Sequence, residues 1–496
     1  MESWSIPHGR LPGSIKFAPR YPLSQAGYPV RKLGRRQVAS GQLYPLSLPF
    51  IYHRGGYRTD QRTFLECRSV TFFKKTKLMA SSILPTTTRI QVLDFIRGFA
   101  LFGILVINIQ TYALFAFLRP EQVYALSLDQ PTTYAPTQFF LHLFFKGQFY
   151  TLYSFLFGLG FYLMEQKNQQ AGWDANRLFK RRLWGLLLLG LIHAFIFWFG
   201  DVLHKYALLG FTLIYFNRQS VATLLRWIIG LVLLVILCQT VNTVFFPATP
   251  QQLAQNQQEF DAVIRQVLQI WQQGSLLQVM SMQALGVVML HLKAVQQGLA
   301  SYAHYLIMFL LGLIAGKLHL FQHIDRFKLS FLRIALLVFP LAVVLKALSG
   351  LPLFGIHLLP PHQLAAEKLL FSLAEFIGTP LLTLVLLMEL TLCWPHLPAR
   401  FVGWIASTGR MGLTNYLLQT LLCMALFYGY AGGLAGKVTL LEALGLVLLI
   451  YGLQVVYSNV WLRYHSMGPM EKLWRRWTYG QEEAAKIKRV KAPAAR

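Results

Sequence analysis

The sequence predicts an all-α protein, a polytopic transmembrane helix bundle of about ten spans, on the strength of three observations. Hydrophobic residues make up 55% of the 496-residue chain and charged residues only 13%, against roughly 45–50% and about 25% in soluble domains. Apolar runs of about twenty residues, long enough to cross the hydrocarbon core of a bilayer, recur along the chain. Lys and Arg gather in alternate loops, as they do in membrane proteins.

The ten expected spans follow ten apolar runs. Backbone polar groups in lipid must be satisfied internally, so each run is expected to be helical. The third and fourth runs are short, and the Gly200–Asp201 junction between them could form a tight hairpin. The runs cover residues 95–118, 137–164, 183–199, 202–217, 225–246, 301–318, 331–349, 368–393, 410–429 and 438–462.

The positive charge alternates between the connecting loops. Residues 165–182, after the second span, hold five Lys or Arg, and the tail from Arg463 holds nine. The intervening loops are poorer, with Arg119 in one and Lys205 in another. This alternation predicts that both termini lie in the cytoplasm. It accounts for the net charge of +27 without a nucleic-acid partner.

Residues 1–78 differ from the rest of the chain, because they are basic and show neither a helical nor a strand period. They hold fourteen Lys or Arg, and their one apolar run is broken by Pro45 and Pro49, so no signal-peptide core is present. The segment could be a disordered cytosolic tail, an organellar transit peptide, or an upstream translation. We favour the last, with the native start at Met79.

The remaining chain divides into two transmembrane halves, residues 79–246 with spans 1–5 and residues 301–480, followed by a basic cytoplasmic tail at 481–496. The Gln-rich segment 247–300 between the halves is expected to be an outer loop. Apolar residues at helical spacing between Phe260 and Trp271 predict an amphipathic helix within it. That helix could lie at the membrane interface or cover a site. The four cysteines form no C-x-x-C pair, so neither a disulfide framework nor a metal site is predicted.

Ionisable and amide side chains inside spans are costly and by default indicate function. In the first span, Asp94 and Arg97 are three residues apart and can pair on one face, and Asn108 lies three turns further along that face. These three residues and Lys146, at the start of the second span, are candidate substrate-binding residues. The alternative is an ion pair that orients the helix, with Asn108 bridging neighbouring helices. Gly158 and Gly160 are expected to permit close helix contact.

His193 is the strongest catalytic candidate. It lies seven residues before Gly200, about 10 Å below the expected outer surface at 1.5 Å per residue. A buried His near a carboxylate can act as a general base held in one tautomer, and Asp201 is the nearby carboxylate. The alternative is a packed histidine with a purely structural hydrogen bond.

The later spans add further candidate substrate-binding residues. Glu375 and Glu389 are fourteen residues apart, so they point the same way and could relay protons, or each could pair with Arg97 or Arg410. Asn415 and Gln419 are four residues apart and share a face, where they could bind substrate or join helices. The candidates from this half are Glu375, Arg410, Asn415 and Gln419.

Four ordered blocks between residues 89 and 480 resemble the YeiB-like family of bacterial membrane proteins. The last block, with its two parts, resembles that family's C-terminal domain of unknown function 418. The blocks are Leu93-Asp94-x-x-Arg97-Gly98 with Asn108-Ile109, Phe149-Tyr150-x-Leu152 with Phe157-Gly158-x-Gly160, Gly190-Leu191-Ile192-His193 with Gly200-Asp201, and Gly409-Arg410-Met411 with Asn415-Tyr416 and Gly468-Pro469-x-Glu471-x-x-Trp474.

The resemblance implies a multi-pass protein of the bacterial cytoplasmic membrane. The family is similar to a wider clan of membrane acyltransferases that includes heparan-alpha-glucosaminide N-acetyltransferase, and the Asp-x-x-Arg-Gly opening is the shared feature. Such enzymes pass an acyl group from cytosolic acyl-CoA to an acceptor across the membrane. The implied partners are therefore the lipid bilayer, acyl-CoA as donor substrate, and a glycan or lipid acceptor, with no bound cofactor.

Three hypotheses follow. In an acyltransferase, His193 would take the acceptor's proton, Asp201 would orient it, and Arg97, with Arg181 and Arg182, would meet the phosphates of acyl-CoA. In a small-solute or proton-coupled transporter, the ionisable residues within the spans would carry protons or solute. A membrane scaffold would use its basic tail to bind partners or anionic lipid.

Overall fold

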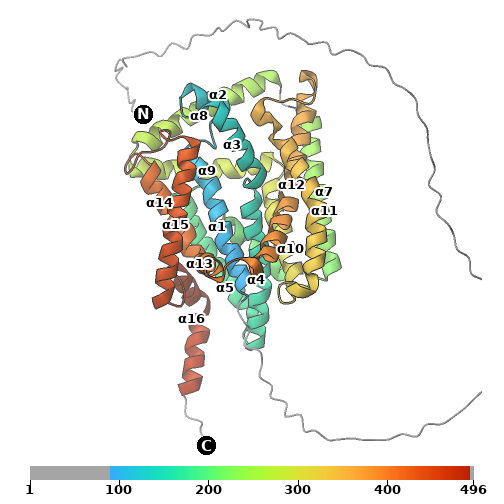
Figure 1. Ribbon diagram of the computed structural model, residues 1–496, viewed down its shortest axis with the longest axis vertical. Helices are drawn as coiled ribbons and strands as arrows, with labels where there is room; N and C mark the ends of the chain where they lie inside the picture. The colour runs from blue at the N-terminus through green and yellow to red at the C-terminus, as the bar shows by residue number, and fades with distance from the viewer. Residues whose placement is uncertain (1–89, 248, 492–496) are drawn as a thin grey trace, which may run out of the picture. The chain divides into compact units, whose positions relative to one another are not determined.

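The computed structural model describes residues 90–247 and 249–491, which belong to one compact unit of the chain, residues 82–496. The predictions for residues 1–78, Met79 and Cys67 lie outside the described residues. The described part is built of helices without any strand (Figure 1), so the all-α prediction is confirmed.

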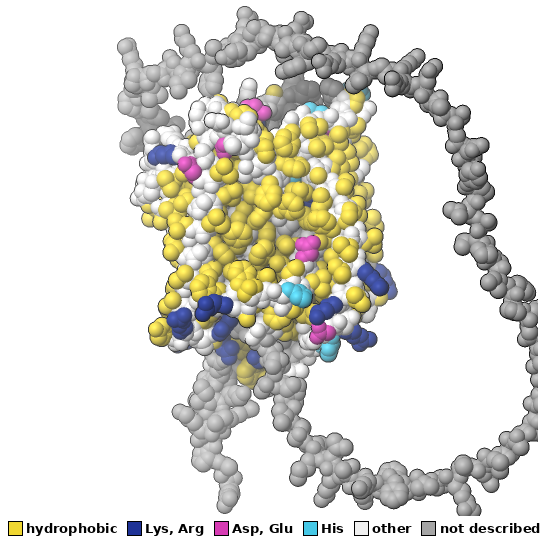
Figure 2. Space-filling model, viewed as in Figure 1, with side chains coloured by type: hydrophobic (Ala, Val, Ile, Leu, Met, Phe, Trp, Pro, Cys, Tyr) yellow, Lys and Arg dark blue, Asp and Glu magenta, His cyan; other side chains and the backbone are white. Residues whose placement is uncertain are grey.

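Seven helices of the described part are long and apolar enough to cross a membrane, so the chain is a multi-pass membrane protein. Figure 2 shows one face of the bundle with hydrophobic side chains across its middle and Lys and Arg gathered near the α16 end. The seven are α1 (Gln91–Tyr112), α7 (Val221–Phe245), α9 (Leu276–Gln296), α10 (Ala300–Lys317), α11 (Ile324–Gly350), α12 (Leu364–Cys393) and α15 (Leu440–Tyr464).

Shorter or less apolar helices complete the bundle. In Figure 1, α8 lies at the end of the bundle opposite α16, and we refer to these as the α8 end and the α16 end. The additional helices are α2 (Pro120–Ala125), α3 (Pro131–Phe144), α4 (Gln148–Gln170), α5 (Ala175–Ile192), α6 (Leu203–Phe216), α8 (Pro250–Gln273), α13 (Ala399–Arg410), α14 (Gly412–Phe427) and α16 (Pro469–Lys491).

The structure divides one of the expected spans and adds a helix directly before another. The run 137–164 breaks between α3 and α4 at Gly147, whose φ of 94° lies in the region that favours glycine. The run 410–429 is preceded by a separate helix, α13, which ends at Arg410, and α14 begins at Gly412. A helix boundary within an apolar run leaves no mark on hydropathy, so composition alone could not find either break.

The segment 247–300 is two helices rather than a loop with one. Helix α8 covers the expected amphipathic stretch and buries Ile264 and Trp271. Helix α9, which sequence analysis missed, is itself apolar enough to cross a membrane. Gln278, Gln283, His291 and Lys293 interrupt its apolar residues, which concealed it. The ten-span count and the cytoplasmic location of both termini stay predictions.

Close helix contacts depend on glycine, as expected at Gly158. A Cβ at Gly158 of α4 would overlap the backbone carbonyl of Phe309 in α10, and one at Gly312 of α10 would overlap the carbonyl of Phe155. A second crossing joins α1 to α13, where a Cβ at Gly409 would overlap the carbonyl of Asp94. Small residues let helix backbones approach closely where lipid supplies no hydrophobic drive.

The α4–α10 crossing predicts a matched pair of outcomes. Gly158→Ala should destabilise the bundle by about 1–3 kcal/mol, the usual cost of overpacking. Gly230→Ala, in the exposed middle of α7, meets no described atom within 4 Å and should be neutral or stabilising. Thermal unfolding of the purified protein in detergent, followed by tryptophan fluorescence, measures both; equal unfolding temperatures would contradict the packing account.

Candidate functional site

His193 lies where the backbone of α5 changes from α-helix to a single turn of π-helix, His193–Phe197. Single π-turns are rare and occur frequently at functional sites. The chain then reverses through Gly200 into α6. A Cβ at Gly190 would overlap the backbone nitrogen of His204, so glycine allows α5 and α6 to form the tight hairpin that the sequence permits.

Asp201 lies at the centre of a buried cluster, with 0% of its surface exposed. Its Oδ1 is 2.9 Å from His193 Nδ1 and accepts the Tyr416 hydroxyl at 3.2 Å. Its Oδ2 is 2.7 Å from His204 Nδ1 and accepts the His204 backbone N–H at 3.0 Å. A buried carboxylate is costly unless hydrogen-bonded, and these four contacts meet that cost.

The contacts of His193 define its chemistry. With Nδ1–H donating to Asp201, the Nε2 lone pair faces the Thr420 hydroxyl, 3.0 Å away. A carboxylate, an imidazole and a hydroxyl in this order form the arrangement that activates a hydroxyl for nucleophilic attack. We call His193, Asp201, His204, Tyr416 and Thr420 the Asp201 cluster. It lets His193 accept a proton from a hydroxyl while Asp201 stabilises the resulting cation.

Three cavities reach this cluster from different sides. The first, the apolar cavity of about 770 Å³, has His193 and Thr420 in its wall. Leucines from α5, α14 and α15 are the commonest of its other lining residues. It is suited to a hydrocarbon chain that places a polar group beside His193 Nε2.

The second, the arginine cavity of about 330 Å³, reaches from Arg97, Arg182 and Arg410 to Tyr416. Arg97 pairs with Asp94 at 3.0 Å, as the sequence predicted. The Arg182 guanidinium lies 3.5 Å over the Trp474 ring of α16. An Arg410 Nη atom donates to the Ser466 carbonyl at 3.2 Å.

Helix α16 closes the arginine cavity through Glu471. Its carboxylate accepts the backbone N–H groups of Leu413 and Thr414 at 2.7 and 3.0 Å and the Thr414 hydroxyl at 2.6 Å. It therefore caps the N-terminus of α14, where a negative charge is favourable. A Cβ at Gly468 would overlap this carboxylate, which explains the glycine three residues earlier.

The third, the lysine cavity of about 520 Å³, is lined by Lys146, Lys205, Lys293 and Asn108. Ile104, Val202, Tyr206 and Tyr416 line both this cavity and the arginine cavity. The two cavities therefore adjoin at the Asp201 cluster, and two candidates from sequence, Asn108 and Lys146, lie on the far side of that junction from Arg97.

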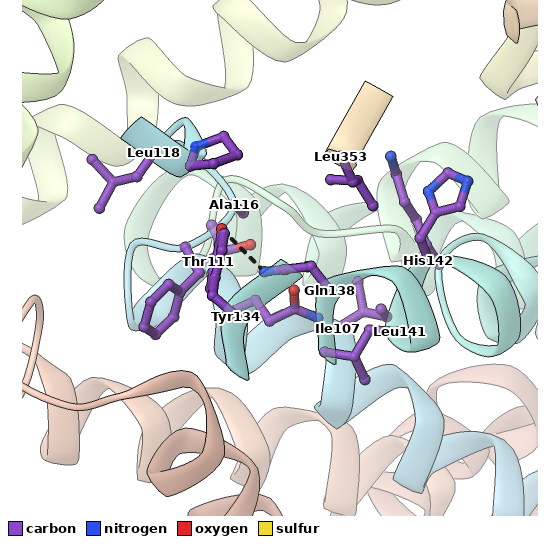
Figure 3. A pocket seen from close by; sticks show the side chains of 13 residues that line it. Ile107, Thr111, Ala116, Leu118, Tyr134, Gln138, Leu141, His142 and Leu353 are labelled. Carbon is purple, nitrogen blue, oxygen red and sulfur yellow. Dashed lines mark hydrogen bonds between the residues drawn. The ribbon is translucent and has the colours of Figure 1, made fainter. Parts of the chain in front are cut away.

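Glu375 belongs to a polar network formed with Lys346, Ser349 and His142. It pairs with Lys346 at 2.8 Å and accepts the Ser349 hydroxyl at 2.8 Å, rather than pairing with Arg97 or Arg410. His142 lies 3.4 Å from it. Figure 3 shows His142 beside Leu141, Gln138 and Tyr134 in the wall of an adjoining cavity of about 280 Å³. Glu389 is exposed, so the two glutamates form no buried proton relay.

Asn415 and Gln419 join helices rather than line any of these cavities. Asn415 donates to Ser458 of α15 at 2.8 Å. Gln419 donates to Gln454 of α15 at 3.0 Å and to the Leu101 carbonyl of α1 at 3.3 Å. This geometry matches the helix-joining alternative for both amides.

Sequence analysis missed three residues that the structure makes prominent. Lys346 is a cation inside the run 331–349, and that alone could have marked it. Thr420 follows Gln419 directly but carries no charge or motif. Glu471 was noted only as one residue of the family block Gly468-Pro469-x-Glu471-x-x-Trp474, without a role. Among the described residues, no group of three or more His, Cys, Asp or Glu is arranged to hold a metal ion.

Comparison with known proteins places the chain among uncharacterised bacterial proteins. Residues 315–481 match the family model described as a protein of unknown function (DUF418). The chain is 30% identical over 420 residues to YxaH of Bacillus subtilis, covering 80% of this chain and 97% of that protein. It is 31% identical over 405 residues to YeiB of Escherichia coli, covering 78% and 95%.

A third relative is a 39.9 kDa protein encoded beside an amylase gene in Bacillus acidopullulyticus, 27% identical over 406 residues, 79% of this chain and 95% of that protein. No solved structure matches. The expected resemblance is confirmed: a multi-pass helical chain whose DUF418 region lies in its C-terminal half, with bacterial relatives matched over nearly their whole length, belongs to the YeiB-like family.

Proposed function

We propose that this protein is an acyltransferase of the bacterial cytoplasmic membrane, which moves an acyl group from cytosolic acyl-CoA to an acceptor on the outer side. The observation that carries the proposal is the convergence of three cavities on the Asp201 cluster. One is lined by arginines, one by lysines and one by apolar side chains. The apolar cavity reaches His193 itself, and the other two reach Tyr416, which donates to the Asp201 carboxylate beside His193.

The donor would enter through the arginine cavity. Arg97, Arg182 and Arg410 line this cavity together, and each guanidinium carries five N–H donors. Phosphates of acyl-CoA suit such groups. The thioester would then lie near Tyr416, whose ring centroid is 5.2 Å from that of His193.

The reaction assigns one role to each member of the His–Asp pair. An acceptor hydroxyl replaces the Thr420 hydroxyl at His193 Nε2 and attacks the acyl carbonyl. His193 takes the hydroxyl proton, the new C–O bond forms, the C–S bond breaks, and His193 returns the proton to the CoA thiolate. Asp201 holds the imidazole in the required tautomer and stabilises its cation. General-base help of this kind contributes roughly 10²–10⁴ in rate.

Transport of a small solute is the second candidate, and the Lys346–Glu375 pair favours it. Lys346 is fully buried, and its ammonium also donates to the Lys146 carbonyl at 3.0 Å. A charge pair within apolar helices can bind or relay ions. We rank it second because these residues lie outside the junction of the cavities, where a transported solute would pass.

The proposed base role of His193 makes a testable prediction. His193→Gln should lower acyl transfer roughly 10²–10⁴-fold while the protein stays folded. The assay follows label from radioactive acyl-CoA into lipid and glycan fractions of membranes that contain the protein.

The control for this test is His304→Gln. His304 is also a buried, doubly hydrogen-bonded histidine, held by Tyr150 at 3.0 Å and by the Phe376 carbonyl at 2.7 Å. Its replacement should change transfer only a few-fold. Equal losses in the two variants would remove the base role from His193.

A further prediction distinguishes acyl transfer from transport. Glu375→Gln alone would leave Lys346 buried without its partner, at about 3–5 kcal/mol, so the paired variant Lys346→Met/Glu375→Gln is used. It should retain acyl transfer, and wild-type proteoliposomes should show no proton flux beyond that of the paired variant. Flux in wild type that disappears in the paired variant would favour transport instead.

A further inference from the structure

The lysine cavity combines an unusual surplus of positive charge with polar walls. Three lysines line it, and its lining includes no Asp or Glu. Two carboxylates near these lysines are Asp201, which acts on Lys205, and Glu375, which interacts with Lys146. Asp201 is already bonded to His193, His204 and Tyr416, and Glu375 is paired with Lys346, so neither neutralises the cavity.

Of the three lysines, Lys205 is the one best placed to bind an anion in the cavity. It is 8% exposed, yet among the described residues its ammonium has no hydrogen-bond or ion-pair partner. The ammonium nitrogen is not among the fully buried polar atoms that lack a partner, so it opens onto the cavity whose wall Lys205 forms. Lys146 and Lys293 are more exposed and lie on the same cavity. Lys205 is therefore a largely buried side chain that presents its ammonium to the cavity, where an anion can pair with it.

Three helices also begin at this cavity. Gly147 and Val202 are the residues that precede the first turns of α4 and α6, and Ser301 lies in the first turn of α10; all three line the cavity. The N-terminus of a helix carries about half a positive charge and unpaired N–H groups, and it attracts anions. The helix ends thus add to the charge of the lysines rather than oppose it.

From this convergence we propose that the lysine cavity binds the phosphate group of an anionic ligand. Phosphate suits it because several ammonium donors and helix N-termini can share one multiply charged, acceptor-rich group. The phenol groups of Tyr150 and Tyr305, the Ser301 hydroxyl and the Gln297 amide line the same space and can bond the sugar or glycerol portion beside the phosphate. Such a ligand could be a lipid headgroup or a soluble phosphate compound.

The proposal of a phosphate-binding site depends only on the residues of this cavity. Its use as the acceptor site of acyl transfer rests on the proposed function. In that use, the phosphate would anchor the acceptor among the lysines, and the rest of the molecule would extend past Tyr416, which lines this cavity and bonds Asp201, to bring its hydroxyl to His193 Nε2.

The test measures binding and needs no enzymatic activity. Purified protein in detergent is titrated calorimetrically with inorganic pyrophosphate, which reports a soluble source. Protein in phosphatidylcholine nanodiscs with and without phosphatidic acid is compared by thermal unfolding, which reports a lipid source. Lys205→Met and the more exposed Lys293→Met remove cavity charges, and Lys437→Met, an exposed lysine in the connection from α14 to α15, is the control.

We expect at least one probe to stabilise or bind the wild-type protein. Lys205→Met should weaken that effect about tenfold or more, as loss of a charged hydrogen bond implies, and Lys293→Met about threefold or more, whereas Lys437→Met should leave it unchanged. Pyrophosphate dependence would indicate a soluble ligand, and phosphatidic acid dependence alone a lipid. The proposal would be overturned if neither probe bound the wild-type protein. It would also be overturned if a folded Lys205→Met variant bound normally and Lys293→Met had no more effect than Lys437→Met.

Discussion

The buried carboxylate of Asp201 is the interaction on which the centre of this bundle depends. One group with no exposed surface holds His193 at the end of α5, His204 in α6 and Tyr416 in α14. Through His204, whose Nε2 lies 3.4 Å from that of His291, the contacts extend to α9. In a low-dielectric interior such a network is strong only when all its members are satisfied. The members of the network therefore constrain one another's positions, and the contacts with Asp201 and Thr420 hold the His193 ring in one orientation.

The glycine crossings and the Asp201 cluster serve complementary purposes. Gly158, Gly312 and Gly409 bring helix backbones into contact, so the bundle is tight where α4 meets α10 and where α1 meets α13. The cavities open where larger polar side chains hold neighbouring helices apart, as Tyr206 and Tyr416 do at the junction of the arginine and lysine cavities. Arginines gather on one side of that junction and lysines on the other. The bundle thus has two polar cavities that meet at Tyr416, whose hydroxyl bonds Asp201.

The sequence predicted the features that arise from composition or short spacing. Apolar runs predicted helices, the three-residue spacing of Asp94 and Arg97 predicted their pair, and the closeness of His193 to Asp201 in sequence predicted a shared location. Prediction from the sequence failed where two interacting residues come from distant parts of the chain. Thr420 is 227 residues from His193, and no period or motif connects them. Glu375 was expected either to relay protons with Glu389 or to pair with Arg97 or Arg410, but its partner is Lys346 on the adjacent α11, and hydropathy does not show which helices are neighbours. The break at Gly147 was missed because hydropathy does not mark a helix boundary inside an apolar run, and α9 was missed because Gln278, Gln283, His291 and Lys293 interrupt its apolar residues.

The central claim is that donor and acceptor approaches meet at the Asp201 cluster. Its most direct test is a cryo-electron microscopy structure of the protein in nanodiscs with a non-hydrolysable thioether analogue of acyl-CoA. The account predicts phosphate density beside Arg97 and Arg182 and the acyl end of the analogue beside Tyr416 and His193. An analogue bound elsewhere, with the arginine cavity empty and His193 still bonded to Thr420, would contradict it.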